Sequence, residues 1–170
     1  MKLREVTDND HEWLVELHND PVVLKNLTNP NPITLQSHLA WWNSIKDNNT
    51  EKRLIFENNN EKIGFTKFYK IDAVNKNCML GADIHKSHRG KGFAKPMWAL
   101  MLNKCFYELS LYRVSLTTAS FNTVAQNVYS DLGFLTEGRR VKELLRDDNY
   151  YDCICMYMLR DMWNDAWSKK

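Results

Sequence analysis

The sequence has no uninterrupted apolar run that approaches the roughly 18 residues needed to cross a lipid bilayer. Its first five residues, Met-Lys-Leu-Arg-Glu, also lack the apolar centre of a secretory signal peptide. These two absences predict a cytoplasmic protein that has no membrane partner.

The sequence also lacks a large excess of charge of either sign. Its 23 Lys and Arg residues nearly balance its 21 Asp and Glu residues, which leaves a net charge of +2. Dedicated nucleic-acid binders usually carry a strong basic excess, so we predict no nucleic-acid partner. The charges are mixed along the chain, although a few lysines near a site can still steer an anionic ligand toward it.

Metal-binding patterns of cysteine and histidine are missing as well. The chain has four cysteines, at positions 78, 105, 153 and 155, but no C-x-x-C pair and no His-rich segment beside them. A structural zinc site normally needs such closely spaced ligands. We therefore predict no metal, and we expect reduced, largely buried thiols in a cytosolic protein.

No internal repeat divides the 170 residues, so length alone favours one domain with a substantial core. Periodicity and capping residues predict the elements in the order β-α-α-β-β-β-α-β-α-β-β. The predicted strands cover residues 3–7, 53–57, 62–71, 78–84, 112–120, 134–143 and 150–159. The predicted helices cover residues 8–18, 34–45, 93–109 and 122–132.

Residues 88–94 read His-Arg-Gly-Lys-Gly-Phe-Ala and join a predicted strand to a predicted helix. Glycines in such a turn allow successive backbone N–H groups to converge on one point, and the helix N-terminus adds partial positive charge there. Arg89 and Lys91 add full positive charges. The turn therefore favours a phosphate or pyrophosphate ligand.

Two common phosphate motifs do not fit this turn. No Lys-Ser or Lys-Thr follows the last glycine, which excludes a P-loop, and the dinucleotide pattern G-x-G-x-x-G fails at Pro96. The pattern that fits is R-x-x-G-x-A, formed by Arg89, Gly92 and Ala94. A second block, N-x-x-A-x-x-x-Y-x-x-x-G-F, is formed by Asn122, Ala125, Tyr129, Gly133 and Phe134.

In this order and spacing, the two blocks resemble the pyrophosphate loop and the catalytic helix of the GNAT superfamily of N-acetyltransferases. The resemblance covers essentially the whole chain and implies one acetyltransferase domain over residues 1–170. It implies an α/β (mixed α+β) fold with a central mixed, mostly antiparallel sheet of about seven strands and about four flanking helices. It also implies transfer of an acetyl group from acetyl-CoA to a primary amine, by direct attack in a ternary complex, in a monomer or homodimer.

The same resemblance implies roles for individual residues. It places the cofactor along Ala82, Asp83, Ile84, Arg89, Gly90, Lys91, Gly92, Phe93, Ala94 and Asn122. It makes Tyr129 the group that protonates the departing CoA thiolate. The residues alone leave alternatives open: Tyr129 as a core tyrosine, Arg89 as a solvated turn residue, and Asn122 as a helix N-cap.

The group that deprotonates the amine is not identified by a motif. Some family members place a glutamate early in the strand before the pyrophosphate loop, but residues 78–80 here are Cys-Met-Leu. We expect deprotonation through ordered water, assisted by Glu137, His85 or Asp152, with no preference among the three.

The acceptor amine is indicated only by further resemblance. Residues 16–21, 32–42 and 150–159 resemble the branch of ribosomal-protein N-terminal, spermidine and amino-sugar-nucleotide acetyltransferases. The pairing of His38 with Trp42 is most similar to the amino-sugar members, and the basic segment 139–146 offers contacts for a diphosphate. The candidate substrate-binding residues are His38, Trp42, Glu137 and Asp152.

Three acceptors therefore remain open, with an amino-sugar nucleotide slightly ahead of a polyamine or a protein N-terminus. A polyamine site needs several carboxylates to hold its ammonium groups, and the candidates are Glu12, Glu16, Asp20 and Glu137. An alternative of a different class is a regulatory module that binds acyl-CoA without catalysis.

Overall fold

The computed structural model describes residues 1–163; residues 164–170, the end of the predicted domain, lie outside the described part. Its strands are β1 (Lys2–Glu5), β2 (Lys52–Asn58), β3 (Glu61–Asp72), β4 (Asn77–Ile84), β5 (Arg113–Ala119), β6 (Leu135–Arg146) and β7 (Asn149–Leu159). They form a seven-stranded sheet in the order β1-β2-β3-β4-β5-β7-β6. Every neighbouring pair is antiparallel except the parallel pair β4–β5, which confirms the predicted mixed sheet.

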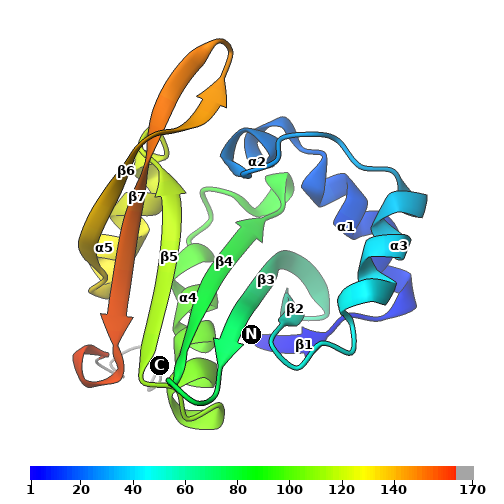
Figure 1. The fold of residues 1–170 in the computed structure, drawn as a ribbon. Coiled ribbons are helices and arrows are strands. Elements are labelled where there is room, and N and C mark those ends of the chain that lie inside the picture. The colour runs from blue at the N-terminus through cyan, green and yellow to red at the C-terminus, as the bar shows by residue number, and fades with distance from the viewer. Residues whose placement is uncertain (164–170) are drawn as a thin grey trace.

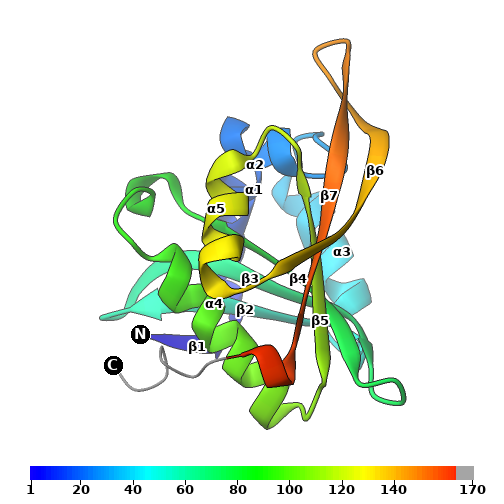
Figure 2. The same ribbon diagram turned by 90° about the vertical axis from the view of Figure 1, so that its left-hand side faces the viewer.

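Helices cover both faces of the sheet (Figures 1 and 2). They are α1 (His11–His18), α2 (Pro21–Asn26), α3 (Leu35–Ile45), α4 (Ala94–Asn103) and α5 (Thr123–Leu132). The main core contains α4 and α5 residues packed on side chains such as Phe56 and Phe68 of one sheet face. A smaller core joins α1 and α2 to Ile55 and Phe65 on the opposite face. No helix among the described residues is long and apolar enough to cross a bilayer.

Helix α2 is the one α-helix that the sequence pattern did not predict. The helix predicted over residues 8–18 ends just before the segment Asn-Asp-Pro at positions 19–21, and no helix was predicted to follow it directly. Asp20 does follow the end of α1, but its side chain also accepts hydrogen bonds from the backbone N–H groups of Val22 (3.0 Å) and Val23 (3.2 Å). With Pro21 at the first helical position, the same residues therefore begin a new helix.

Several local signals in the sequence are confirmed by the backbone. Asn59 and Asn60 have φ values of 50° and 62° in the turn between β2 and β3, which joins the strands predicted at residues 53–57 and 62–71. The Thr34 side chain accepts a hydrogen bond from Ser37 N at the start of α3. Gly133 follows α5 with a φ of 98°, as expected of a helix C-terminal glycine.

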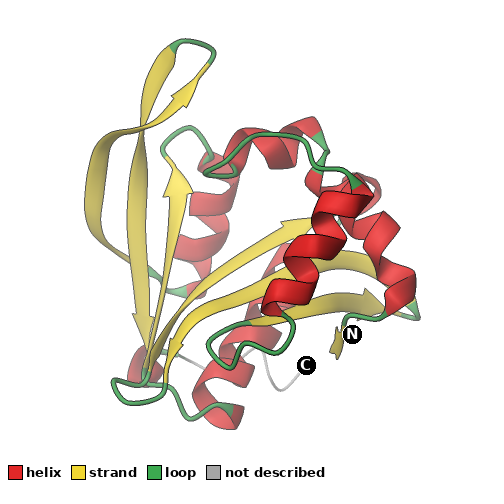
Figure 3. Ribbon diagram, turned by 45° about the vertical axis from the view of Figure 1, so that its right-hand side comes forward, coloured by secondary structure: helices red, strands yellow, loops and turns green. Residues whose placement is uncertain are grey.

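Strands β4 and β5 lie side by side at one end only. Their pairing is limited to Asn77–Met79 against Arg113–Ser115, and beyond it the two strands diverge, as Figures 1 and 3 show. The backbone of β4 after Met79 therefore has a strand partner on the β3 side alone. This divergence opens the sheet at the point where the predicted site residues gather.

The β6–β7 hairpin closes the far side of this opening and projects beyond β5 (Figure 1). Arg146, near its tip, is buried and donates from Nε to the carbonyl oxygen of Lys25 at 2.9 Å. The same guanidinium also donates from Nη2 to the carbonyl oxygen of Leu27. These bonds tie the hairpin to the end of α2, across the opening between β4 and β5.

Candidate functional site

A cleft of about 750 Å³ occupies the divergence between β4 and β5. Its lining includes Ala82, Asp83, Ile84, Arg89, Gly90, Ala94, Asn122 and Tyr129, all predicted from the sequence. Lys91, Gly92 and Phe93 belong to the same turn but do not line the cleft. The Phe93 ring instead packs edge-on against Phe56 and His88, with ring centroids 6.3 and 5.9 Å apart.

The glycine turn has the backbone that its residues predict. Gly90 and Gly92 have φ values of 73° and 80°, a region that residues with a side chain rarely adopt. A Cβ atom built at either position would meet no atom within 4 Å. Backbone conformation rather than crowding therefore requires these glycines. The space beside them is open to an anion at the N-terminus of the ten-residue helix α4.

Arg89 is engaged with the protein itself. Its Nε donates to the carbonyl oxygen of Ile84 at 2.9 Å, and its Nη2 lies 2.8 Å from Oδ1 of Asp20. Burial of the Asp20 carboxyl raises its pKa, but the Arg89 hydrogen bond and the N–H groups of α2 outweigh burial and keep that pKa low. Arg89 thus links the glycine turn to the start of α2, and its contact with a phosphate stays a prediction.

Asn122 lies in the cleft and also caps a helix. Its side-chain oxygen accepts from the backbone N–H of Ala125 at 3.3 Å, at the start of α5. The helix-cap alternative considered from the sequence is therefore present, and it is compatible with a cleft-facing amide because Asn122 also lines the cleft.

Tyr129 is held on α5 with 9% of its surface exposed, and it lines the cleft. Its ring packs edge-on against Trp98, with ring centroids 4.8 Å apart, and lies tilted against the Phe134 ring, with centroids 5.9 Å apart. Burial raises the pKa of the phenol well above its usual value, and the nearby Asp83 and Tyr69 raise it further. Within the described residues the hydroxyl has no hydrogen-bond partner, so it is a protonated donor that remains free.

The cleft also contains residues that sequence reasoning missed. Arg53 of β2 and Lys67 and Tyr69 of β3 all line it. Lys67 Nζ lies 2.5 Å from Oδ2 of Asp83, which is the only carboxylate in the cleft lining of the described chain. The period-2 alternation of β3 was the available signal, since it places residues 67 and 69 on one face. No motif marked that face as the one bordering the cleft.

The three groups predicted to assist deprotonation lie outside this lining. Glu137 forms an ion pair with Arg113 on the exposed part of β6. The buried Asp152 accepts from the Lys142 backbone N–H at 2.6 Å and pairs with Arg139.

His85, the third group, lies 2.7 Å from Ser87 Oγ through its Nδ1. Its ring stacks on Trp13, with the ring centroids 5.6 Å apart. The structure therefore brings none of the three to the cleft, and an assisting role for them stays a prediction without geometric support.

The predicted substrate residues His38 and Trp42 also lie elsewhere. His38 is 4% exposed, and its Nε2 is 3.0 Å from Nδ1 of His11, so the two imidazoles join α3 to α1. Burial, followed by the charges of His11 and His18, lowers the pKa of His38 to about 4. The Trp42 ring packs edge-on against His11 at 5.5 Å.

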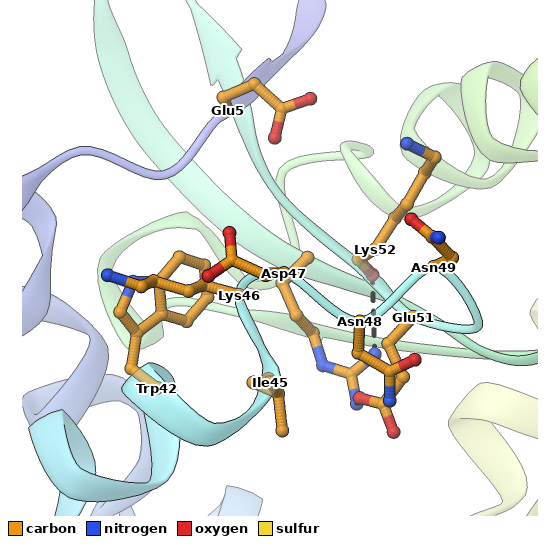
Figure 4. A pocket seen from close by; sticks show the side chains of 10 residues that line it. Glu5, Trp42, Ile45, Lys46, Asp47, Asn48, Asn49, Glu51 and Lys52 are labelled. Atoms are coloured by element: carbon orange, nitrogen blue, oxygen red, sulfur yellow. Dashed lines mark hydrogen bonds and ion pairs between the residues drawn. The ribbon is translucent and has the colours of Figure 1, made fainter.

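Trp42 lines a second, smaller pocket of about 370 Å³ beyond the end of α3 (Figure 4). The charged side chains around this pocket are Glu5, Asp47, Glu51, Lys46, Lys52 and Arg53. Arg53 borders both this pocket and the cleft. Because the pocket carries both signs of charge in equal number, its charge favours neither a cation nor an anion.

The arginines of the basic segment 139–146 form ion pairs and hydrogen bonds within the protein. Arg139 pairs with Asp152, and Arg140 Nη1 lies 2.6 Å from Oε1 of Glu143. Arg146 holds the α2 carbonyl groups described above. None of these three arginines lines the cleft in the described chain.

Among the described residues, no group of three or more His, Cys, Asp or Glu side chains has a geometry that could hold a metal ion. The four cysteines are free thiols; Cys78, Cys105 and Cys153 are buried and Cys155 is partly exposed. Cys78 Sγ and Cys105 Sγ lie 3.6 Å apart inside the main core. The thiols are therefore mostly buried, as the sequence predicted.

Comparison with known proteins agrees with this geometry. The family described as "Acetyltransferase (GNAT) domain" matches residues 1–135. An uncharacterized, prophage-derived N-acetyltransferase of Bacillus subtilis is 28% identical over 143 residues, covering 84% of this chain and 81% of the relative. The spermidine N(1)-acetyltransferase of Vibrio cholerae is 28% identical over 123 residues, covering 72% and 71%.

The fold also matches a solved structure. The spermidine N-acetyltransferase of Vibrio cholerae, solved in complex with CoA and spermine, superposes with a TM-score of 0.90 at 24% identity. The match covers 95% of this chain and 96% of the other. At this identity the similarity establishes the shared fold.

Proposed function

This chain belongs to the GNAT family and is an acetyl-CoA-dependent N-acetyltransferase, and we propose that it acetylates a small-molecule primary amine by direct attack in a ternary complex. The observation that carries the proposal is that Tyr129 and the glycine turn border one cleft. A cleft that reaches from an anion-binding turn to a buried proton donor can hold both reactants at once.

The residues around the cleft fit acetyl-CoA. The glycine turn and the N-terminus of α4 would hold the pyrophosphate through backbone N–H groups. The unpaired edge of β4 at residues 82–84 would bind the amide groups of the pantetheine arm. Bound there, acetyl-CoA supplies a thioester whose carbonyl carbon is open to attack by an amine.

The chain's own groups then stabilise the charges that develop. A backbone N–H on the free edge of β4 would donate to the oxygen that becomes negative. Tyr129 would donate its proton to the leaving sulfur, because its high pKa keeps it protonated and its hydroxyl has no other described partner. Asp83, the carboxylate in the cleft lining, is the group placed to receive a proton from the amine, directly or through water.

The sequence left three acceptors open, an amino-sugar nucleotide, a polyamine and a protein N-terminus, and the geometry bears on the first two. An amino-sugar nucleotide was favoured by His38, Trp42 and the basic segment 139–146, which do not line the cleft. A polyamine is favoured by the name of the Vibrio cholerae relative. Among the described residues, the cleft lining offers the cations Arg53, Lys67 and Arg89 against the single carboxylate of Asp83, which is poor support for a polycation. We therefore propose a small amine without assigning it to either class.

An acceptor-panel assay tests this function. Release of free CoA is measured with polyamines, amino-sugar nucleotides, amino acids and short peptides, each at several concentrations of acetyl-CoA. Direct attack predicts initial-rate lines that intersect, whereas parallel lines would indicate an acetylated enzyme and contradict the ternary complex. Binding of acetyl-CoA without turnover of any amine would contradict acetyl transfer to a small molecule.

A further inference from the structure

Three charged side chains on the sheet face that borders the cleft, together with Glu51 just before β2, form a row. Arg53 of β2 and Lys67 of β3 are directly opposite each other in the strand register, and Lys67 is opposite Gly81 of β4. Arg53 Nη2 lies 2.6 Å from Oε2 of Glu51, and Lys67 pairs with Asp83. The row therefore has carboxylates at its two ends and two adjacent cations in its middle.

Two like charges on directly opposite residues destabilise a sheet unless another group offsets them. Arg53 is also partly removed from water: burial lowers the pKa of its guanidinium, although Glu51 and Tyr69 act in the opposite direction. Each of the two cations has one carboxylate partner, Glu51 or Asp83, and no other carboxylate among the described residues pairs with either of them. A further anion would gain charged hydrogen bonds from both cations. This arrangement points to a negatively charged group between Arg53 and Lys67 when the cleft is filled.

The outer end of the row offers the complementary charge. Lys67 engages Oδ2 of Asp83, and among the described residues nothing donates to its Oδ1. The charge of Asp83 reaches the Tyr129 phenol, so this carboxylate lies near the proton donor. Gly81 has no side chain. A Cβ atom there would lie 3.6 Å from the Lys67 side chain, so its absence leaves space beside Lys67.

We propose that the acceptor carries a carboxylate close to its amino group, as an α-amino acid does; this inference rests on the proposed function. The amino group binds Oδ1 of Asp83, next to Tyr129. The carboxylate binds Lys67 and those N–H groups of Arg53 that are not used by Glu51 or by the carbonyl oxygens of Lys52 and Phe68. The acceptor thus matches the charges of the cleft with one positive and one negative group of its own.

Matched acceptors test the carboxylate directly in the wild-type enzyme. Each amino acid is compared with the amine that lacks only its carboxylate: phenylalanine with phenethylamine, methionine with 3-methylthiopropylamine, and lysine with cadaverine. We expect kcat/KM to be roughly 10- to 100-fold higher for the amino acid of the best pair, as for a charged hydrogen bond. Spermidine, a tripeptide and an amino-sugar nucleotide complete the panel.

A lysine variant assigns the effect to this site. Lys67→Met should lower the kcat/KM advantage of the amino acid over its decarboxylated partner roughly 10- to 100-fold, and acetyl-CoA affinity should change little. Any effect of the lost Lys67–Asp83 ion pair acts on both acceptors and cancels in this ratio. Lys104→Met is the matched control, because Lys104 also pairs with a carboxylate, at 2.6 Å, and its side chain is 22% exposed against 23% for Lys67. Lys104 does not line the cleft.

The outcomes separate this inference from the proposed function. Faster acetylation of spermidine, the peptide, the nucleotide or the decarboxylated amines would overturn the carboxylate assignment and leave acetyl transfer intact. An unchanged preference for the amino acid in folded Lys67→Met would overturn the site. No turnover with any acceptor would contradict the proposed function and this inference together. If Lys67→Met is too unstable to assay, the comparison of matched acceptors in the wild-type enzyme still tests whether the carboxylate of the acceptor contributes.

Discussion

Single side chains in this cleft have their chemical states set by their surroundings. Tyr129 is buried between Trp98 and Phe134 with a free hydroxyl, which keeps the phenol protonated at neutral pH. Gly92, by contrast, contributes only a backbone conformation, since its φ of 80° is closed to most other residues. Substitution of Tyr129 should therefore lower turnover, whereas substitution of Gly92 should lower the affinity for acetyl-CoA.

Replacing Tyr129 with phenylalanine keeps the ring and removes only the hydroxyl. We expect turnover to fall by roughly 10²–10⁴-fold, as for loss of a general acid, with little change in acetyl-CoA affinity. Steady-state rates and calorimetry measure the two quantities. Tyr107→Phe is the control, because Tyr107 is exposed and outside the cleft. Turnover near the wild-type rate in Tyr129→Phe would show that another group protonates the thiolate.

Replacing Gly92 with valine forces a β-branched residue into a positive-φ position. The turn should then distort, and acetyl-CoA affinity should fall by roughly tenfold or more, because such backbone strain costs about 1–3 kcal/mol. Gly138→Val is a suitable control: Gly138 also has no neighbour within 4 Å of a built Cβ, but its φ is not positive. Calorimetric affinity equal to that of the control would remove the turn from the binding site.

Pairs of elements are joined by polar contacts that no short motif indicates. Helices α1 and α3 meet through the buried imidazoles of His11 and His38. The β6–β7 hairpin meets α2 through Arg146, and the glycine turn meets α2 through Arg89 and Asp20. Helix α2 is therefore held from two sides above the cleft, which makes its position sensitive to both contacts.

The histidine pair makes the α1–α3 contact sensitive to pH. His38 has a folded-state pKa of about 4, below its usual value near 6.5, so the unfolded chain binds the proton more readily. Its stabilising contribution is complete above about pH 6.5 and is lost as the pH falls toward 4. In thermal melts, wild type should lose more stability over this range than His38→Gln, which cannot titrate. Parallel pH profiles for the two proteins would contradict this role.

At the scale of the whole molecule, the two larger hydrophobic cores of the described residues lie on opposite faces of a sheet that opens between β4 and β5. A ligand in this opening contacts residues from both sides, so it binds the folded chain and not the unfolded one. Such a ligand stabilises the fold by mass action. At a fixed ligand concentration, the size of this stabilisation therefore reports the affinity of the cleft for the ligand.

Acetyl-CoA at a hundred times its dissociation constant should contribute about 2.7 kcal/mol to stability. For a chain of this size, that corresponds to a rise in Tm of roughly 5–10 °C. Pantetheine lacks the pyrophosphate, so the same concentration of pantetheine should produce a much smaller rise, measured by differential scanning fluorimetry. Equal shifts with the two ligands would place the pyrophosphate outside the glycine turn.

The sequence by itself determined the features that depend on neighbouring residues. The glycine turn, the helix starts predicted at residues 34 and 122, and the helix end predicted at residue 132 depend on local backbone requirements. The structure has the glycine turn, the N-caps at Thr34 and Asn122, and the end of α5 before Gly133 at these positions. The order of strands and helices followed from hydrophobic periodicity, apart from α2. That helix was missed because Asp-Pro both ends one helix and begins another, and the next six residues are too few for a clear period.

Only the tertiary structure decided which side chains share the cleft. Lys67 and Arg53 enter it because the register of β2 and β3 brings that sheet face to the opening, whereas His38 is enclosed against His11 and Asp152 is engaged by the hairpin. A local pattern specifies the conformation of a segment but not the residues far along the chain that it meets. Because charge pairing and burial arise from those distant contacts, the glycine turn was predictable and the charges that line the cleft beside it were not.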